Sequence, residues 1–122
     1  MKQNTPVKTK ILVIDNELPI RKALVKMIQH FNVEDQYEIF EADGVRSGIE
    51  AIQHIEPEIL FLDIELDDGL AFDIFKEIND LQAQLIFTTA HNHYAVRAFE
   101  YSALDYLLKP VSPTLLHNAL LK

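Results

Sequence analysis

Acidic residues gather at two points of the chain where an apolar run ends. Asp15 and Glu17 follow the apolar residues 11–14, and Asp63 follows residues 59–62. Carboxylates that lie close together raise one another's pKa unless a cation lies between them. Mg²⁺ takes oxygen ligands and keeps water in its remaining positions, and a carboxylate beside it can attack a phosphoryl group. These residues therefore indicate a magnesium-dependent site that accepts a phosphoryl group.

A hydroxyl and an ammonium end two later apolar runs. Thr88 and Thr89 end residues 84–89, and Lys109 ends residues 105–109. Each has an ordinary explanation by itself, because threonine favours strands and lysine is common at surfaces. Together with the carboxylates they favour one shared site, where they would offset the charge on the transferring phosphoryl oxygens.

The apolar runs alternate with segments of helical period. We expect strands at residues 10–14, 37–42, 59–62, 84–89 and 105–109. We expect helices at residues 18–31, 44–55, 70–78 and 94–102, and a fifth that begins at Ser112 as N-cap with Pro113 in its first turn. Five strands alternating with five helices predict an α/β fold with a parallel sheet that is covered on both faces. In such sheets ligands bind at the carboxyl ends of the strands, where the acidic residues, Thr89 and Lys109 lie.

Length and composition narrow the class of protein. The 122 residues suffice for one domain, and a net charge of −8 has the wrong sign for gripping nucleic acid through its phosphates. The absence of cysteine excludes disulfides and thiolate metal sites. The apolar runs are far shorter than the roughly 20 residues that span a bilayer. We expect a single cytoplasmic domain over residues 1–122, with a flexible terminus at residues 1–8, that binds neither nucleic acid nor membrane.

Three stretches of the chain resemble the response-regulator receiver domain of two-component systems, and most of all the receivers of LytTR-type regulators. They are ILVIDNE (11–17), ILFLDIEL (59–66) and FTTAHNHYAVRAFEYSALDYLLKPV (87–111). The resemblance implies a flavodoxin-like, doubly wound sheet of five parallel strands in the order 2-1-3-4-5. It also implies Mg²⁺ as the cofactor.

The resemblance assigns roles to individual residues. It makes Asp63 the phosphoacceptor, with Thr89 and Lys109 as the groups that bind the phosphoryl oxygens. It places the metal on Asp15, Asn16, Asp63 and the backbone carbonyl of Glu65, with Glu17 as a further ligand if its side chain reaches the ion.

Other assignments concern the switch. Tyr106 and Thr89 correspond to the pair whose movement accompanies activation, and the Lys109–Pro110 bond corresponds to one that is usually cis. We expect His91 and Glu65 to flank the phosphoryl group.

Asn16 departs from the receiver pattern, which has an acid at this position. An amide oxygen can coordinate Mg²⁺, but the site loses one negative charge, and Mg²⁺ depends on anionic ligands. Glu17 either compensates for that loss or caps the helix that follows. The affinity for Mg²⁺ should therefore be low.

The expected function is a receiver that takes a phosphoryl group from a sensor histidine kinase and changes conformation to control an output domain, which would be a DNA-binding domain outside this chain. It would not be an enzyme beyond its own phosphorylation and dephosphorylation. The alternative is a receiver-like interaction module that works without phosphate, which Asn16 favours. The last helical segment has no C-terminal cap, which suggests part of a longer regulator.

The segment 94–102 carries the expected partner surface. We expect a homodimer through the fourth helix, fifth strand and fifth helix, with Tyr94, Arg97 and Tyr101 exposed and Phe99 covering the sheet.

Three other motifs give weaker indications of function. His91 and His93 could bind a metal, but no third ligand is evident near them in the sequence. DIE at 63–65 only faintly resembles the D-x-D motif of haloacid-dehalogenase phosphatases, and the three glycines do not form a dinucleotide-binding fingerprint.

Overall fold

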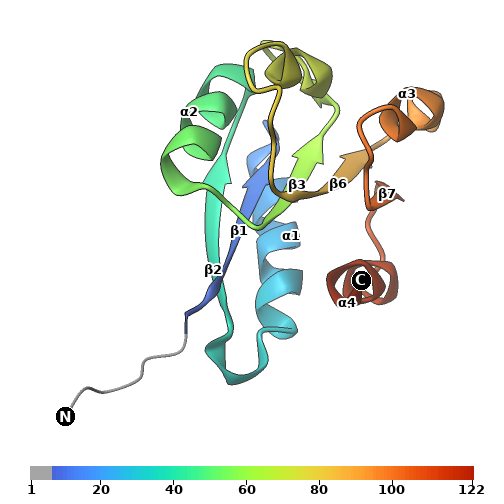
Figure 1. Ribbon diagram of the computed structural model, residues 1–122. Coiled ribbons are helices and arrows are strands. Elements are labelled where there is room, and N and C mark those ends of the chain that lie inside the picture. The colour runs from blue at the N-terminus through green and yellow to red at the C-terminus, as the bar shows by residue number, and fades with distance from the viewer. Residues whose placement is uncertain (1–6) are drawn as a thin grey trace.

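A five-stranded parallel sheet forms the centre of the molecule (Figure 1). The computed structural model describes residues 7–122, so most of the predicted flexible terminus lies outside the described residues. The sheet strands are β1 (Thr9–Ile14), β2 (Tyr37–Ala42), β3 (Ile59–Asp63), β6 (Gln84–Thr89) and β7 (Asp105–Leu108). Their order is β2-β1-β3-β6-β7. The predicted α/β fold and its strand order 2-1-3-4-5 are confirmed.

Helices cover both faces of the sheet. The α-helices are α1 (Leu18–His30), α2 (Val45–Ile55), α3 (Ala95–Phe99) and α4 (Pro113–Leu121), and the 3₁₀ helices are η1 (Val33–Asp35) and η2 (Ala71–Lys76). Helices α1 and α4 pack on one face, and α2, η2 and α3 on the other. As predicted, Ser112 caps α4, because its hydroxyl accepts a hydrogen bond from the backbone N–H of Leu115. Within residues 7–122 we find no helix with the length and apolar content needed to cross a membrane.

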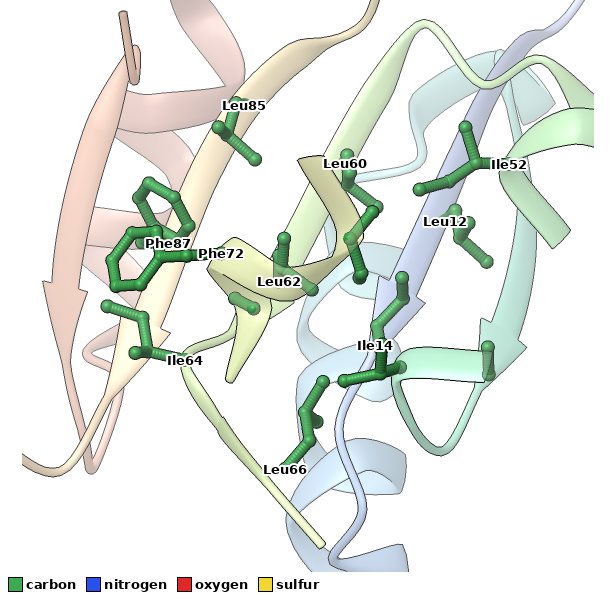
Figure 2. Packing of buried hydrophobic residues seen from close by; sticks show 14 of the residues in the cluster. Leu12, Ile14, Ile52, Leu60, Leu62, Ile64, Leu66, Phe72, Leu85 and Phe87 are labelled. Atoms are coloured by element: carbon green, nitrogen blue, oxygen red, sulfur yellow. The ribbon is translucent and has the colours of Figure 1, made fainter. Parts of the chain in front are cut away.

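Alternation along the strands divides the core into two layers. In β3, Leu60 and Leu62 face the layer under α2 and η2, which Figure 2 shows, whereas Ile59 and Phe61 face α1 and α4. All residues of β3 are buried, as expected for a central strand covered on both faces. The strand therefore delivers Asp63 to the carboxyl edge of the sheet from a rigid, fully packed element.

The predicted helix at 70–78 is wrong in type and in its first residues. The chain instead forms a two-stranded hairpin, β4 (Glu65–Leu66) and β5 (Gly69–Leu70), which is followed by the 3₁₀ helix η2. Gly69 has a φ of 148°, a conformation that L side chains rarely adopt, and it closes the hairpin. The backbone N–H of Ala71 then bonds to the carbonyl of Ile64, which holds the start of η2 against the end of β3.

In the segment 94–102, Arg97 is exposed as predicted, whereas the predictions for Phe99 and Tyr101 are wrong. Phe99 is 78% exposed and does not cover the sheet. Tyr101 stacks on Phe72 and Phe75 of η2, and the guanidinium of Arg97 lies 4.2 Å from the centre of the Phe72 ring. The α-helix itself spans five residues, shorter than predicted, and the chain soon turns through Ser102 at a φ of 57°. A helix of little more than one turn shows no clear period, so the sequence did not reveal which side faces the core.

Candidate functional site

Strand register brings the predicted site residues to one edge of the sheet. Asp63 is the last residue of β3 and pairs with Thr88, and Thr89 at the end of β6 pairs with Leu108. The backbone N–H of Lys109 donates to the carbonyl of Thr89 at 2.8 Å, so Lys109 leaves β7 beside the end of β6. The Lys109–Pro110 peptide is cis, as predicted.

The ammonium of Lys109 lies among the carboxylates. Its Nζ donates a hydrogen bond to Asp63 Oδ2 at 3.1 Å and lies 2.8 Å from Asp15 Oδ2 and 3.9 Å from Glu17 Oε1. The contact with Asp15 is ionic without hydrogen-bond alignment, because Asp15 Oδ2 has no hydrogen-bond partner among the described residues. One ammonium therefore faces three carboxylates, and the site keeps an excess of negative charge.

Burial sets the protonation behaviour of the site. Asp15 and Asp63 are almost completely buried, and the Lys109 side chain is 12% exposed. Burial, together with a smaller effect of the charge of Asp15, raises the pKa of Asp63 to about 6, while Lys109 opposes the shift. Burial alone would lower the pKa of Lys109, but its contacts with Asp15 and Asp63 outweigh that effect and raise it. At neutral pH the site holds an ionised Asp63 beside a charged ammonium.

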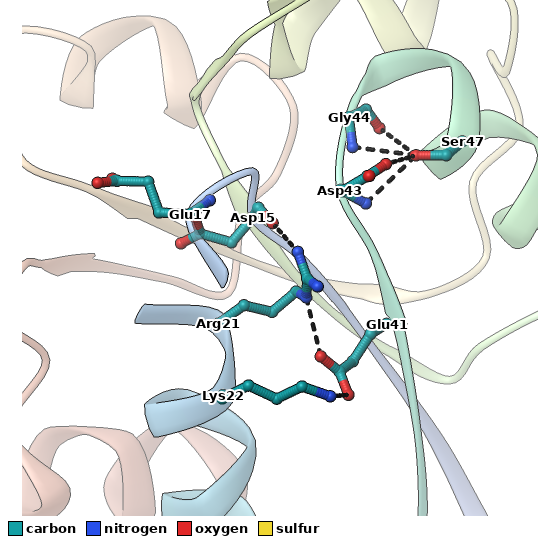
Figure 3. A network of polar contacts seen from close by, with 8 residues as sticks. All are labelled: Asp15, Glu17, Arg21, Lys22, Glu41, Asp43, Gly44 and Ser47. Atoms are coloured by element: carbon teal, nitrogen blue, oxygen red, sulfur yellow. Dashed lines mark hydrogen bonds and ion pairs between the residues drawn. The ribbon is translucent and has the colours of Figure 1, made fainter. Parts of the chain in front are cut away.

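The loop after β1 is held by bonds to its own backbone and to β2 (Figure 3). Asp15 Oδ1 accepts from the backbone N–H of Glu17 at 2.8 Å. Arg21 of α1 donates to the carbonyl of Asp15 at 2.7 Å and to Glu41 at 2.8 Å. Since Glu41 lies in β2, Arg21 links the start of α1 to two neighbouring strands and fixes Asp15 at the sheet edge.

Glu17 belongs to the acidic cluster. It occupies the N-cap position of α1, but its side chain makes no capping hydrogen bond. Instead, one oxygen from each of Asp15, Glu17 and Asp63 lies within 4.8 Å of the others. Of the two roles predicted for Glu17, the structure favours a place among the metal ligands.

The predicted switch residues, Thr89 and Tyr106, both bond to the backbone of His91. Thr89 is fully buried, and its hydroxyl accepts from the backbone N–H of His91 at 3.2 Å; it makes no hydrogen bond to Asp63. The hydroxyl of Tyr106 donates to the carbonyl of His91 at 2.7 Å. His91 Nε2 also lies 2.9 Å from Glu65 Oε1, and Tyr94 donates to Glu65 Oε2 at 2.7 Å. Glu65 and His91, which we expect to flank the phosphoryl group, are thus in direct contact.

Comparison with known proteins decides the family. The model of the response regulator receiver domain matches residues 11–121. The chain is 34% identical over 115 residues to the sensory transduction protein LytT of Bacillus subtilis, which covers 93% of this chain. It is 35% identical over 114 residues to the sensory transduction protein LytR of Streptococcus mutans, covering 92% of this chain. The chain belongs to the response regulator receiver family.

Solved structures agree with the receiver fold. A two-component response regulator from Clostridium difficile matches with a TM-score of 0.80 at 24% identity, covering 93% of this chain and 93% of that one. The chemotaxis response regulator CheY4 of Vibrio cholerae matches with a TM-score of 0.78 at 18% identity, covering 94% and 98%. The receiver chain spans 47% of the length of the LytT and LytR relatives named above.

The receiver's acidic cluster fits a magnesium ion. Asn16 Oδ1 is a buried oxygen that has no hydrogen-bond partner among the described residues, and Asp15 Oδ2 faces the Lys109 ammonium, which it shares with Asp63 and Glu17. Buried acceptors of this kind are costly unless a donor or a cation satisfies them. Oxygen donors with room for water suit Mg²⁺, so Asp15, Asn16, Glu17 and Asp63 can hold the ion in this receiver.

Two acids of the receiver have structural partners that were not predicted from the sequence. Asp68 accepts hydrogen bonds from the backbone N–H groups of Val45 and Arg46, at 2.7 and 3.1 Å, and thereby caps α2 from another element. Asp67 accepts a hydrogen bond from Nδ2 of Asn16 at 3.0 Å. Both contacts join residues more than 20 positions apart, so no local pattern reveals them.

We predict that Asp63→Asn changes how the stability of the receiver depends on pH. Because burial raises the pKa of Asp63 from 3.8 to about 6, the folded state binds the proton more tightly than the unfolded state. Stability is therefore lost as pH rises through this window. Asp63→Asn removes the effect, so its advantage over the unmodified metal-free protein should be largest near neutral pH and shrink toward about pH 4.

Urea unfolding over this pH range measures the difference. Asp80→Asn, which changes an exposed acid that accepts a hydrogen bond from Gln82, is the control and should follow the unmodified protein. An Asp63→Asn advantage that does not vary with pH would contradict the assigned pKa.

Proposed function

We propose that this receiver is a phosphorylation-dependent switch, with Asp63 as the phosphoacceptor. The observation that carries the proposal is the placement of a buried carboxylate at the end of the central strand, 3.1 Å from the ammonium of Lys109 and within 4.8 Å of two further acidic ligand atoms. A nucleophile, a fixed positive charge and a metal-binding group thus share one small volume.

The proposed reaction transfers a phosphoryl group from a phosphohistidine of a sensor kinase. An oxygen of Asp63 forms the new O–P bond while the P–N bond breaks, and the imidazole nitrogen keeps the bonding pair and takes a proton from water. Bound Mg²⁺ supplies positive charge to the phosphoryl oxygens. Lys109 neutralises a second part of that charge. The hydroxyl of Thr89, which accepts a hydrogen bond from the backbone N–H of His91, donates its own hydrogen to a phosphoryl oxygen.

An apolar groove beside the acceptor supports a protein donor. It has a volume of about 590 Å³ and runs between α1 and the segment that follows β7. Ile20, Leu24 and Met27 line one side, Pro110 and Val111 line the other, and Asp15 and Lys109 stand at its edge. A helix of the kinase seated here would present its phosphohistidine to Asp63.

A phosphate-independent interaction module is the second candidate. It is favoured by Asn16, which lowers the negative charge that Mg²⁺ requires. The buried ion pair of Asp63 and Lys109 favours the switch, because an interaction surface has no need of a buried nucleophile.

We predict that a small-molecule phosphodonor adds about 80 daltons to the purified protein in the presence of Mg²⁺. Asp63→Asn should abolish the gain, because no other carboxylate in the site is held by Lys109 at the end of the central strand. Intact-mass spectrometry gives the readout. Asp68→Asn is the matched control and should keep the gain; a gain on Asp63→Asn would move the acceptor elsewhere.

We predict that the Glu65–His91 pair slows hydrolysis of the aspartyl phosphate. The pair joins the two sides of the site at 2.9 Å, and Tyr94 holds Glu65 from a third direction, so an attacking water must pass them. Glu65→Ala and His91→Ala should each increase the dephosphorylation rate several-fold. Decay of the phosphorylated mass over time measures it, and His54→Ala is the control. Unchanged rates in both variants would remove this pair from the access path.

We also propose a homodimer through α3, β7 and α4. Val96 and Phe99 of α3 are each 78% exposed, and Leu108 of β7 is 46% exposed, and exposed apolar side chains that form a patch mark interaction surfaces. A phosphoryl mimic should strengthen self-association in sedimentation velocity, and Phe99→Ser should weaken it. Val33→Ser, which changes another exposed apolar residue, should not. A monomer at high concentration under all conditions would contradict this interface.

We propose further that the switch controls a DNA-binding output domain outside this chain.

A further inference from the structure

Asn16 has two differently placed ends. Its Nδ2 donates a hydrogen bond to Asp67 Oδ1 at 3.0 Å. Its Oδ1 is buried and has no hydrogen-bond partner among residues 7–122. Asn16 stands between Asp15 and Glu17 in the sequence, and both of those side chains belong to the acidic cluster. The amide thus uses its donor to bind the turn that carries Asp67 and leaves its acceptor without a hydrogen bond, at the position in sequence between two members of the cluster.

The chemistry of Asp67 determines which end of the amide it binds. An ionised carboxylate only accepts hydrogen bonds, whereas an amide group has one end that donates and one that accepts. Asp67 can therefore bond to Nδ2 but not to Oδ1. The opposite orientation would place the oxygen against a carboxylate and turn the NH₂ group toward a site meant for a cation.

Asp67 is itself held in place. It lies in the turn between β4 and β5, and its neighbour Asp68 binds the N-terminal backbone of α2 through two hydrogen bonds. On the other side of the turn, the backbone N–H of Leu70 bonds to the carboxylate of Asp73 at 2.8 Å. The carboxylate that fixes Asn16 is therefore carried by a turn that is tied down at both sides.

We propose that Asp67 is a positioning residue for Mg²⁺: it orients the amide of Asn16 so that Oδ1 serves as a metal ligand. The inference rests on the metal-dependent function proposed above. Asn16 supplies an oxygen without a charge, and Asp67 supplies a charge next to it without contacting the ion. Together they replace one carboxylate ligand.

The first test is a Mg²⁺ titration followed by NMR of the ¹⁵N-labelled protein. Asp67→Ala frees the amide to rotate and should weaken Mg²⁺ binding about tenfold, the lower end of what loss of an outer partner costs a metal site. Asp67→Asn keeps an acceptor for Nδ2 but adds a donor that can bind Oδ1, so its affinity for Mg²⁺ should lie between those of the unmodified protein and Asp67→Ala. Equal affinities of Asp67→Ala and the unmodified protein would overturn the proposal.

The second test repeats Asp67→Ala in an Asn16→Asp background. A carboxylate offers two equivalent oxygens and needs no orientation, so the effect of Asp67→Ala should fall below about twofold there. If Asp67→Ala weakens binding equally in both backgrounds, Asp67 acts only through long-range charge and does not position Asn16. Asp80→Asn controls for the loss of one acid remote from the site.

The side-chain amide signals of Asn16 report the contact without metal. In the metal-free protein they should be shifted and protected from exchange, lose these features in Asp67→Ala, and keep them in part in Asp67→Asn. Signals that do not respond to Asp67→Ala would overturn the proposed orientation. The outcomes also separate the two proposals: absence of Mg²⁺ binding by the unmodified protein defeats the metal-dependent function, whereas binding that does not depend on Asp67 defeats only this inference.

Discussion

The ammonium of Lys109 lies between two buried carboxylates, and the arrangement of the site depends on this contact. Asp15 and Asp63 come from neighbouring strands, β1 and β3, whose parallel pairing sets their ends side by side. Without a cation, two buried carboxylates whose oxygens lie within 4.8 Å of each other would repel and take up protons. Lys109 reaches them at 2.8 and 3.1 Å from the far side of β6. Because burying an unpaired charge is costly, the position of β7 and the ionisation of Asp63 stabilise each other.

The contact leaves negative charge unbalanced, since Glu17 also belongs to the cluster. That excess is a disadvantage for folding and an advantage for binding a divalent cation. Two buried oxygens without hydrogen-bond partners, Asp15 Oδ2 and Asn16 Oδ1, lie at the same loop. The site therefore combines a cost to stability with a capacity for a ligand, as is common where chemistry takes place.

A continuous set of contacts leads from the site to the outer surface. Glu65 touches His91 and Tyr94, and the carbonyl of His91 accepts from Tyr106 on β7. Tyr94 in turn packs near Phe72, on which Tyr101 stacks. In the switch that we propose, a rearrangement of Thr89 or His91 would reach α3, on which Val96 and Phe99 are exposed. Contiguous contacts of this kind are a physical route by which the site at Asp63 and the surface of α3 can be coupled.

The sequence by itself determined the sheet and the acidic and basic ends of its strands. Short apolar runs that end in Asp15, Asp63, Thr89 and Lys109 specify a covered parallel sheet, because only such strands are buried on both faces and only their carboxyl ends meet at one edge. The fully buried β3 and the ion pair at its end agree with this pattern. The resemblance to receivers then supplied the order of the strands.

Tertiary structure decided what depends on contacts between distant residues. Asp67 and Asp68 are adjacent acids in the sequence, yet one orients Asn16 and the other caps α2. Phe99 and Tyr101 are similar aromatic residues two positions apart, yet one is exposed and the other stacks on η2. Local patterns specify which residues are apolar or charged, whereas partners and exposed faces are fixed only when the loops and short helices are packed against the sheet.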